Sequence, residues 1–161
     1  MNLQWTPTKL RAYKDISTQI ERYKYGGSCA YLKVGKTWAV KLYQDTENRD
    51  FSFFNQRRAS TYNLAPKVGN RFRIRHPNCQ PLNPFWREDR KIIYGFTTQV
   101  VTIRRSSKKQ VKALKEALNE INIYIGDLAI DNNVGYLDKN LLCIDFDYWS
   151  LEAEYLENRI V

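Results

Sequence analysis

Acidic and amide side chains crowd one stretch of this 161-residue chain. Between residues 125 and 147, the sequence "IGDLAIDNNVGYLDKNLLCIDFD" places five aspartates and three asparagines among apolar runs. Aspartate and asparagine often form turns, but their oxygens are also ligands that magnesium takes together with phosphate. The stretch therefore allows two interpretations: turn chemistry, or convergence of Asp127, Asn132 and Asp145 on a magnesium-bound phosphate.

Two further features could contact phosphate. Gly26, Gly27 and Ser28 precede a β-rich segment, and backbone N–H groups in such a turn can approach an anion. Lys41 lies in the next β-rich segment, "WAVKLY", and could supply the positive charge that a transferring phosphoryl group needs. The simpler alternatives are a loop aspartate at position 127, a turn aspartate at position 145 and a solvated strand lysine at position 41.

The elements that must position these residues follow from local patterns. Apolar residues at helical spacing predict helices over 7–24 and 107–122, and the second opens with the capping-box sequence "SKKQ". A third helix is expected over 46–64, where it stops before a proline. Paired β-rich segments around short turns predict one hairpin over 29–43 and another over 133–146.

Two more strands are expected in the middle of the chain. The β-branched segment 91–103, "KIIYGFTTQVVTI", has the length of a well-buried strand. In 70–76, "NRFRIRH", polar and apolar residues alternate, so one strand face would carry Arg71, Arg73 and Arg75. The chain tail, "SLEAEYLENRI", is expected to form a closing helix.

Composition bounds the class of protein. The chain has the length of one ordinary domain. Its 26 Lys and Arg residues outnumber its 17 Asp and Glu residues and give a net charge of +9. This charge favours acidic partners such as nucleotides, nucleic acid or an acidic protein. Three widely separated cysteines fit a reducing compartment, and Cys143 is expected to be buried. No signal peptide and no run of about 18 apolar residues is visible, so we expect a cytoplasmic protein with no membrane span.

The order and spacing of these features resemble the protein-kinase-like phosphotransferases, which include small-molecule kinases of the same fold. "WAVK" resembles the family's V-A-I-K strand, which implies that Lys41 contacts the α- and β-phosphates of ATP. "DLAIDN" resembles the catalytic loop, with Asp127 orienting the acceptor hydroxyl and Asn132 binding magnesium. "DFD" resembles D-F-G, which makes Asp145 the main magnesium ligand and Phe146 its packing support.

Looser matches extend the resemblance over most of the chain. "YGFTTQVV" is similar to the strand that enters the kinase hinge, so adenine would meet the backbone around Gln99 and Val100. Gly26, Gly27 and Ser28 would lie at the phosphates. The implied fold is α+β and protein-kinase-like, with a small antiparallel N-lobe sheet, an αC-like helix and a reduced, mostly helical C-lobe. It forms a single domain, with an N-terminal helix and N-lobe over residues 1–101 and the C-lobe over 102–161.

The chain departs from the family at several positions. Ile125 occupies the place of the catalytic-loop histidine, and Gln56 stands near the position of the carboxylate that would pair with Lys41. Glu47 is an alternative partner, nearer the start of that helix. Asp147 replaces the last glycine of D-F-G, and only fourteen residues follow it, so most of a kinase C-lobe is missing.

The leading interpretation is a kinase that uses Mg²⁺ and ATP to phosphorylate a hydroxyl of a protein or small molecule. The alternative is a pseudokinase that acts as a protein-interaction module, and a second alternative is a basic nucleic-acid-binding protein that uses Arg71, Arg73 and Arg75. A partner protein or a second copy of the chain could complete the reduced lobe. The sequences "RRAS" and "RRSS" also look like basic-directed phosphorylation sites.

Overall fold

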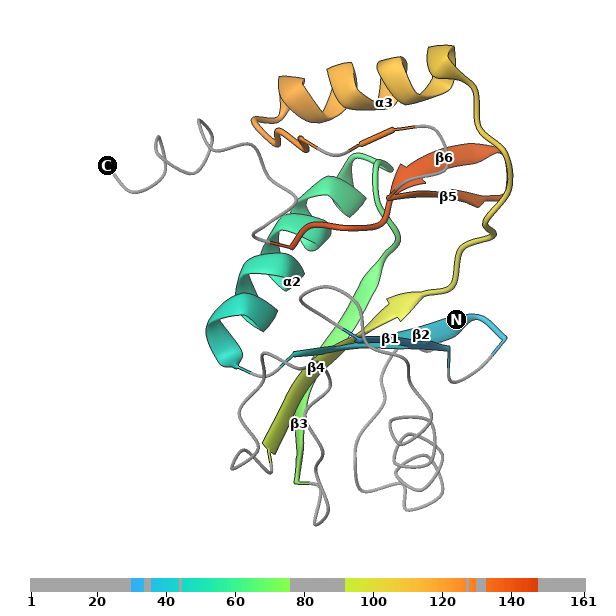
Figure 1. The fold of residues 1–161 in the computed structure, drawn as a ribbon. Helices are drawn as coiled ribbons and strands as arrows, with labels where there is room; N and C mark the ends of the chain where they lie inside the picture. The colour runs from blue at the N-terminus through green and yellow to red at the C-terminus, as the bar shows by residue number, and fades with distance from the viewer. Residues whose placement is uncertain are drawn as a thin grey trace. The chain divides into compact units, whose positions relative to one another are not determined.

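The fold is mixed α+β (Figure 1). The structure, a computed structural model, describes residues 30–33, 36–43, 45–75, 92–126, 128–129 and 133–147. These residues divide into two compact units: one contains the chain up to Asp50 together with Val68–Val100, and the other contains Phe51–Lys67 and the chain from Val101 onward. The helices expected over 7–24 and in the chain tail lie outside the described residues.

The first unit is built on a four-stranded antiparallel sheet with the strand order β1-β2-β4-β3. Its strands are β1 (Ala30–Lys33), β2 (Trp38–Tyr43), β3 (Val68–Arg75) and β4 (Ile92–Gln99). The small antiparallel sheet expected from the sequence is therefore present. The central strand β2 is buried along most of its length because it has a hydrogen-bonded neighbour on each side.

Helix α2 (Thr46–Thr61) starts and ends with local signals that the sequence carries. At its start, the Asp45 carboxylate accepts hydrogen bonds from both the backbone N–H of Asn48, at 2.8 Å, and its side-chain amide, at 2.9 Å. This is an N-cap, which satisfies backbone donors that have no partner within the helix. The helix ends three residues earlier than expected, because Asn63 adopts the left-handed conformation, with φ 57°.

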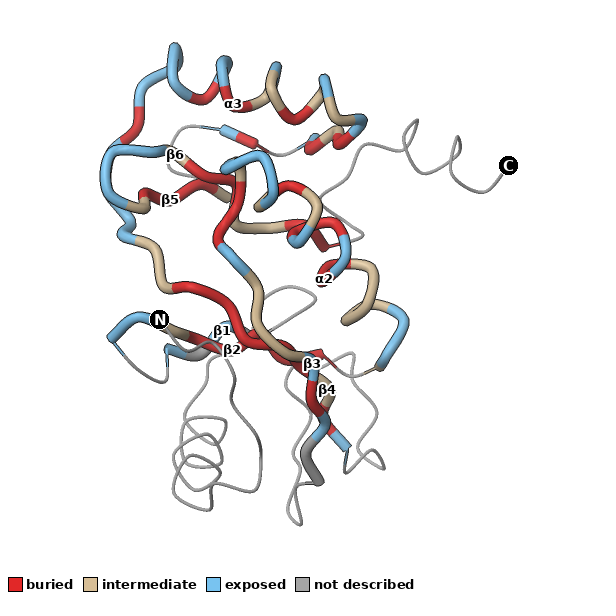
Figure 2. The backbone as a smooth tube through the Cα atoms, turned by 180° about the vertical axis from the view of Figure 1, so that it is seen from behind, coloured by how far each residue is buried: buried red, intermediate tan, exposed pale blue. Residues whose placement is uncertain are grey.

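The second unit contains most of α2, helix α3 (Lys108–Glu120) and a hairpin of β5 (Val134–Leu137) and β6 (Asn140–Cys143). The predicted capping box opens α3: the Ser107 hydroxyl accepts from the N–H of Gln110, and the N–H of Ser107 donates to the Gln110 side chain. Buried and exposed positions alternate along α3 (Figure 2), and the buried ones face the hairpin. The hydrophobic core of the second unit includes Leu114, Leu118, Ile123, Ile125, Val134, Cys143 and Phe146.

Strand β4 ends at Gln99, whereas the sequence predicted a strand up to residue 103. Beyond Val100 the backbone exchanges partners: Thr102 and Tyr136 donate to each other's carbonyl oxygens, both at 2.8 Å. The β-branched sequence is therefore extended, as expected, but its second part pairs with β5 instead of the first sheet. No helix among the described residues is long and apolar enough to span a membrane.

Candidate functional site

Lys41 lies in the middle of β2 and is only 5% exposed, which excludes the solvated strand lysine considered from the sequence. Its direct neighbours across the sheet are Tyr31 on β1 and Phe96 on β4, so the three side chains share one face. The Lys41 ammonium nitrogen lies 5.8 Å from the centroid of the Phe96 ring, within the range of a cation–π interaction. Lysine is rarely buried to this extent unless it is paired or functional.

Tyr31 on β1 is the register partner of this lysine and carries a hydroxyl group. Burial raises the pKa of the Tyr31 hydroxyl above its ordinary value of 10.0, although 40% of the residue remains exposed. The hydroxyl therefore stays protonated at neutral pH and can donate a hydrogen bond to an anion near Lys41. The sequence analysis missed Tyr31, and only the strand register reveals its place.

Gln99 and Val100 lie at the end of β4, where the resemblance places adenine. Gln99 is buried, and its register partner is Trp38 on β2. The N–H of Val100 donates to the carbonyl oxygen of Thr37 at 3.0 Å. This donor is already used within the first unit, so an adenine ring at this position would have to use other backbone groups.

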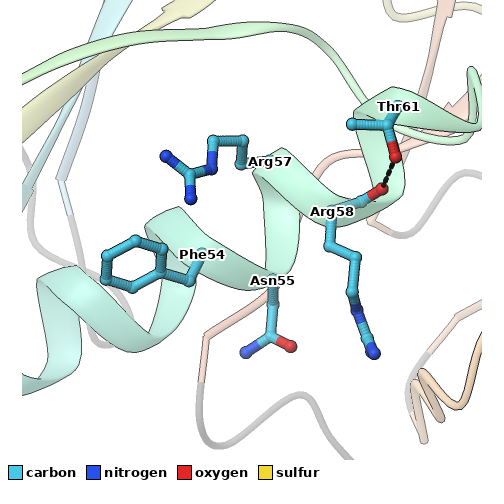
Figure 3. A pocket seen from close by; sticks show the side chains of 5 residues that line it. All are labelled: Phe54, Asn55, Arg57, Arg58 and Thr61. Atoms are coloured by element: carbon cyan, nitrogen blue, oxygen red, sulfur yellow. Dashed lines mark hydrogen bonds between the residues drawn. The ribbon is translucent and has the colours of Figure 1, made fainter.

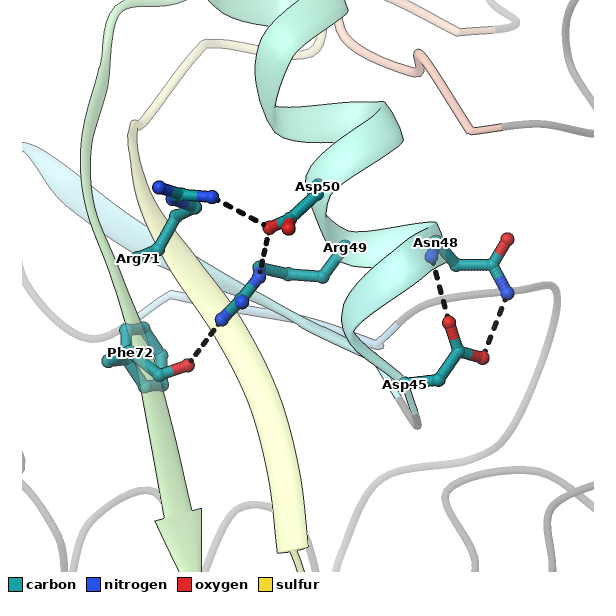
Figure 4. Close-up of polar contacts among 6 residues, drawn as sticks. All are labelled: Asp45, Asn48, Arg49, Asp50, Arg71 and Phe72. Carbon is teal, nitrogen blue, oxygen red and sulfur yellow. Dashed lines mark hydrogen bonds and ion pairs between the residues drawn. The ribbon is translucent and has the colours of Figure 1, made fainter.

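A charged cluster fixes the start of α2 within the first unit (Figure 4). Asp50 accepts from the Arg49 side chain at 2.8 Å and from Arg71 on β3 at 3.1 Å. Arg49 also donates to the carbonyl oxygen of Phe72 at 3.0 Å and lies over the ring of Tyr94. The expected basic face of β3 is thus confirmed in part: Arg71 and Arg73 are exposed on either side of the buried Phe72, but Arg71 is already paired with a carboxylate.

The two α2 residues considered as partners of Lys41, Gln56 and Glu47, lie in different surroundings. Gln56 is fully buried in the second unit, and its side-chain amide donates to the carbonyl oxygen of Pro66 at 3.0 Å. This contact holds the chain after α2 against the helix. Glu47 is exposed in the first turn of the helix, where its negative charge interacts favourably with the helix dipole.

Asp145 follows β6 at a backbone position with several local contacts. One of its carboxylate oxygens accepts the N–H of Asp147 at 3.0 Å, and its carbonyl oxygen accepts the thiol of Cys143 at 3.4 Å. Phe146 is fully buried in the core of the second unit. Asp145 itself is half-buried, and its carboxylate is the predicted magnesium ligand.

The remaining predicted site residues, Gly26, Gly27, Ser28, Asp127 and Asn132, lie outside the described residues. The neighbours of Asp127 are described: Ile125 is 1% exposed and Leu128 is 8% exposed, and both belong to the core of the second unit. Ile125, which stands where the kinase-like resemblance places a histidine, contributes packing. Among the described residues, no three of His, Cys, Asp and Glu lie together as a set of metal ligands.

The exposed side of α2 was not recognised in the sequence. This helix buries Ser52, Asn55 and Gln56, whereas it exposes 44% of Phe54, and 58% of Tyr62 is exposed just beyond its end. The helix also buries Phe53 and Ala59, so its buried side mixes polar and apolar residues while an aromatic ring stays exposed. The available signal was the spacing of Phe54, Arg57 and Thr61, which share one side of a helix.

A second polar network joins α3 to the β5–β6 hairpin. The side-chain oxygen of Gln110 accepts from the hydroxyl of Tyr136 at 2.8 Å, in addition to its capping contacts. The Arg104 guanidinium lies 4.0 Å from the centroid of the Tyr136 ring and donates to the carbonyl oxygen of Asp138 at 2.9 Å. The "RRSS" sequence is therefore part of a structural junction, in which Ser107 caps the helix.

The chain matches no protein-family model, and no curated protein or solved structure is significantly similar to it.

Proposed function

We propose that this chain binds magnesium ATP and transfers a phosphoryl group to a hydroxyl of a protein or small molecule. The observation that carries the proposal is the burial of Lys41 in the central strand of the first sheet. A further support is the order of the elements after it. Strand β2 is followed by a helix, two strands, a second helix and a hairpin that ends two residues before Asp145, which is the order that the kinase-like resemblance implies.

The proposed roles follow from the chemistry of each side chain. Lys41 neutralises the α- and β-phosphates, and the backbone of Gly26, Gly27 and Ser28 donates to them. Asp145 and Asn132 hold the magnesium ion, which would bridge phosphate oxygens and neutralise developing charge. Asp127 orients the acceptor hydroxyl. Adenine would be held by the backbone near Gln99, because the N–H of Val100 is used by Thr37. The reaction would take place in the cytoplasm, the compartment expected from the sequence.

Two observations favour a second candidate, a pseudokinase that binds nucleotide and acts as an interaction module for a partner protein. Gln56 uses its amide to bond the Pro66 carbonyl, so it does not act as a carboxylate for Lys41. Ile125 is buried in the core, so it cannot support the catalytic loop by hydrogen bonds as a histidine would. Both functions require the same nucleotide site and differ in phosphoryl transfer.

The first test is thermal unfolding with and without magnesium ATP for the wild type, Asp145→Asn and the control Glu116→Gln. Asparagine keeps an oxygen that can accept the N–H of Asp147, so the local fold is retained while the charge is lost. Ligand at about 100 times its Kd should stabilise the native state by about 2.7 kcal/mol. Glu116 is exposed, and its only ion pair among the described residues is a 3.9 Å contact with Lys112.

A magnesium-dependent stabilisation that Asp145→Asn loses and Glu116→Gln retains would support the nucleotide site. The absence of a shift in the wild type, or equal shifts in all three proteins, would contradict it. If the nucleotide site is supported, an assay for ADP formation in the presence of hydroxyl acceptors separates the two candidates. An active kinase forms ADP, and its Asp127→Asn variant does not. A pseudokinase binds the nucleotide without forming ADP.

A further inference from the structure

The second unit presents a mixed aromatic and basic surface along one side of α2, which we call the α2 face. Its aromatic members are unusually exposed, at 44% for Phe54 and 58% for Tyr62. At 100° per residue, Phe54, Arg57 and Thr61 fall within about 60° of the helix circumference. The α2 face consists of these three residues and Tyr62, which follows just beyond the end of the helix.

Cation–π contacts organise this face (Figure 3). The Arg57 guanidinium lies 5.0 Å from the centroid of the Phe54 ring and 5.5 Å from that of Phe53. The two rings meet edge to face at 5.2 Å, which fixes the exposed Phe54 against its buried neighbour. Among the described residues, Arg57 makes no ion pair with a carboxylate. The aromatic ring is therefore held in place with a positive charge beside it.

A shallow pocket of about 340 Å³ lies along the same helix. Arg58 and Asn55 point toward one side of the helix and Phe54 with Arg57 toward another (Figure 3). The Thr61 hydroxyl donates to the carbonyl oxygen of Arg58 at 2.7 Å, which ties down the last turn. The Asn55 amide donates to the carbonyl oxygen of Phe51 at 2.8 Å and Arg58 to that of Asn122 at 3.4 Å, whereas the exposed Arg57 guanidinium can donate to a phosphate.

We propose that the α2 face binds single-stranded nucleic acid, with bases stacked on Phe54 and Tyr62 and a phosphate held by Arg57. The charge is complementary, because the chain has a net charge of +9. Exposed rings select unpaired bases, since the bases of a duplex already stack on one another. An acidic peptide would use Arg57 but would gain little from two exposed rings.

The dimensions of the face fit a short segment of a strand. Phe54 and Tyr62 are eight residues apart, which corresponds to about 12 Å along the helix axis. This length covers roughly three to four nucleotides at about 3.4 Å each. The expected contact is therefore small, and its affinity should depend strongly on each ring and on Arg57.

Fluorescence anisotropy of a labelled oligothymidylate of about 16 nucleotides tests the proposal with the full chain. The variants are Phe54→Leu, Phe54→Trp and Arg57→Gln, and the matched control is Lys112→Gln, which removes one exposed positive charge from α3 in the same unit. Phe54→Leu should weaken binding at least about fivefold, the loss expected for one stacked base, and Phe54→Trp should not. Arg57→Gln should reduce the slope of log K against log salt by about 0.7.

Each contrary result overturns the proposal. If the wild-type protein does not bind the oligothymidylate at low salt, single-stranded nucleic acid is excluded as the ligand of the α2 face. Binding that Phe54→Leu and Arg57→Gln leave unchanged, but that Arg73→Gln weakens, moves the contact to β3. If polyglutamate displaces the labelled strand as effectively as unlabelled oligothymidylate does, the face is a general polyanion-binding surface, and an acidic protein becomes the favoured partner. These outcomes are independent of the magnesium ATP test, which probes different residues.

Discussion

Gly95 shows how a single missing side chain sets the packing of the first sheet. A Cβ atom added there would lie 2.6 Å from the Phe72 ring and 2.7 Å from the carbonyl oxygen of Lys41. The space above Gly95 is therefore filled by Phe72 from β3. Its backbone neighbour is the strand segment that carries the lysine of the proposed site, so packing and site geometry depend on the same glycine.

We expect Gly95→Ala to reduce the free energy of unfolding by about 1–3 kcal/mol, because the methyl group overpacks a well-filled core. Urea unfolding followed by circular dichroism measures the change. Replacing Phe72 by the smaller leucine should relieve the clash only in part, because the Lys41 carbonyl cannot move away. The destabilisation caused by Gly95→Ala should therefore be smaller in a Phe72→Leu background than in the wild type, but not zero. A Gly95→Ala protein as stable as the wild type would contradict the close packing.

At the scale of elements, the two helices share one way of ending. In each case an asparagine in the left-handed conformation, at φ 57° for Asn63 and 60° for Asn122, is followed by an apolar residue. The N–H of that residue reaches back to a carbonyl five positions earlier, which is the Schellman arrangement. The hydrogen bonds run from Leu64 to Ala59 at 3.1 Å and from Ile123 to Leu118 at 3.0 Å.

Substitution at these two asparagines should distinguish backbone conformation from side-chain chemistry. Asn63→Ala and Asn122→Ala are each expected to lower stability by about 1 kcal/mol, because alanine tolerates the left-handed conformation poorly. Asn63→Gly and Asn122→Gly should be close to neutral, since glycine enters this conformation without steric cost. Thermal unfolding of the four variants provides the measurement. A loss in the glycine variants equal to that in the alanine variants would assign the effect to the amide groups.

At the scale of the whole molecule, α2 is the covalent element that belongs to both units. Its first residues, Thr46–Asp50, count with the first unit and the remainder with the second. Because the helix runs without a break between them, unfolding of one unit would remove part of a continuous helix from the other. We therefore expect the described residues to unfold in one cooperative transition.

Leu118→Ala tests this cooperativity from the second unit. Leu118 is fully buried, so the change should cost about 2–5 kcal/mol. In native-state hydrogen exchange with mass spectrometry, the variant should lower protection in β2 and β4 as much as in α3. Reduced protection confined to the second unit would show that the two units open independently.

The elements could be predicted from the sequence where their signals are local. The starts of both helices follow from capping residues next to them in the chain, Asp45 and Ser107, and the hairpins follow from turns between β-rich segments. The alternation of Arg71, Phe72 and Arg73 also gave the correct faces of β3. The end of β4 could not be predicted, because it depends on Thr102 pairing with Tyr136, more than thirty residues away.

For the candidate site, residue types, spacing and the local geometry around Asp145 follow from the amino-acid order alone. The tertiary structure decided which of them are enclosed: it buried Lys41 between two strands and brought Tyr31 beside it. It also committed the N–H of Val100 to Thr37. The physical reason is that burial and strand register depend on neighbours from distant parts of the chain, whereas caps and turns depend on residues within a few positions.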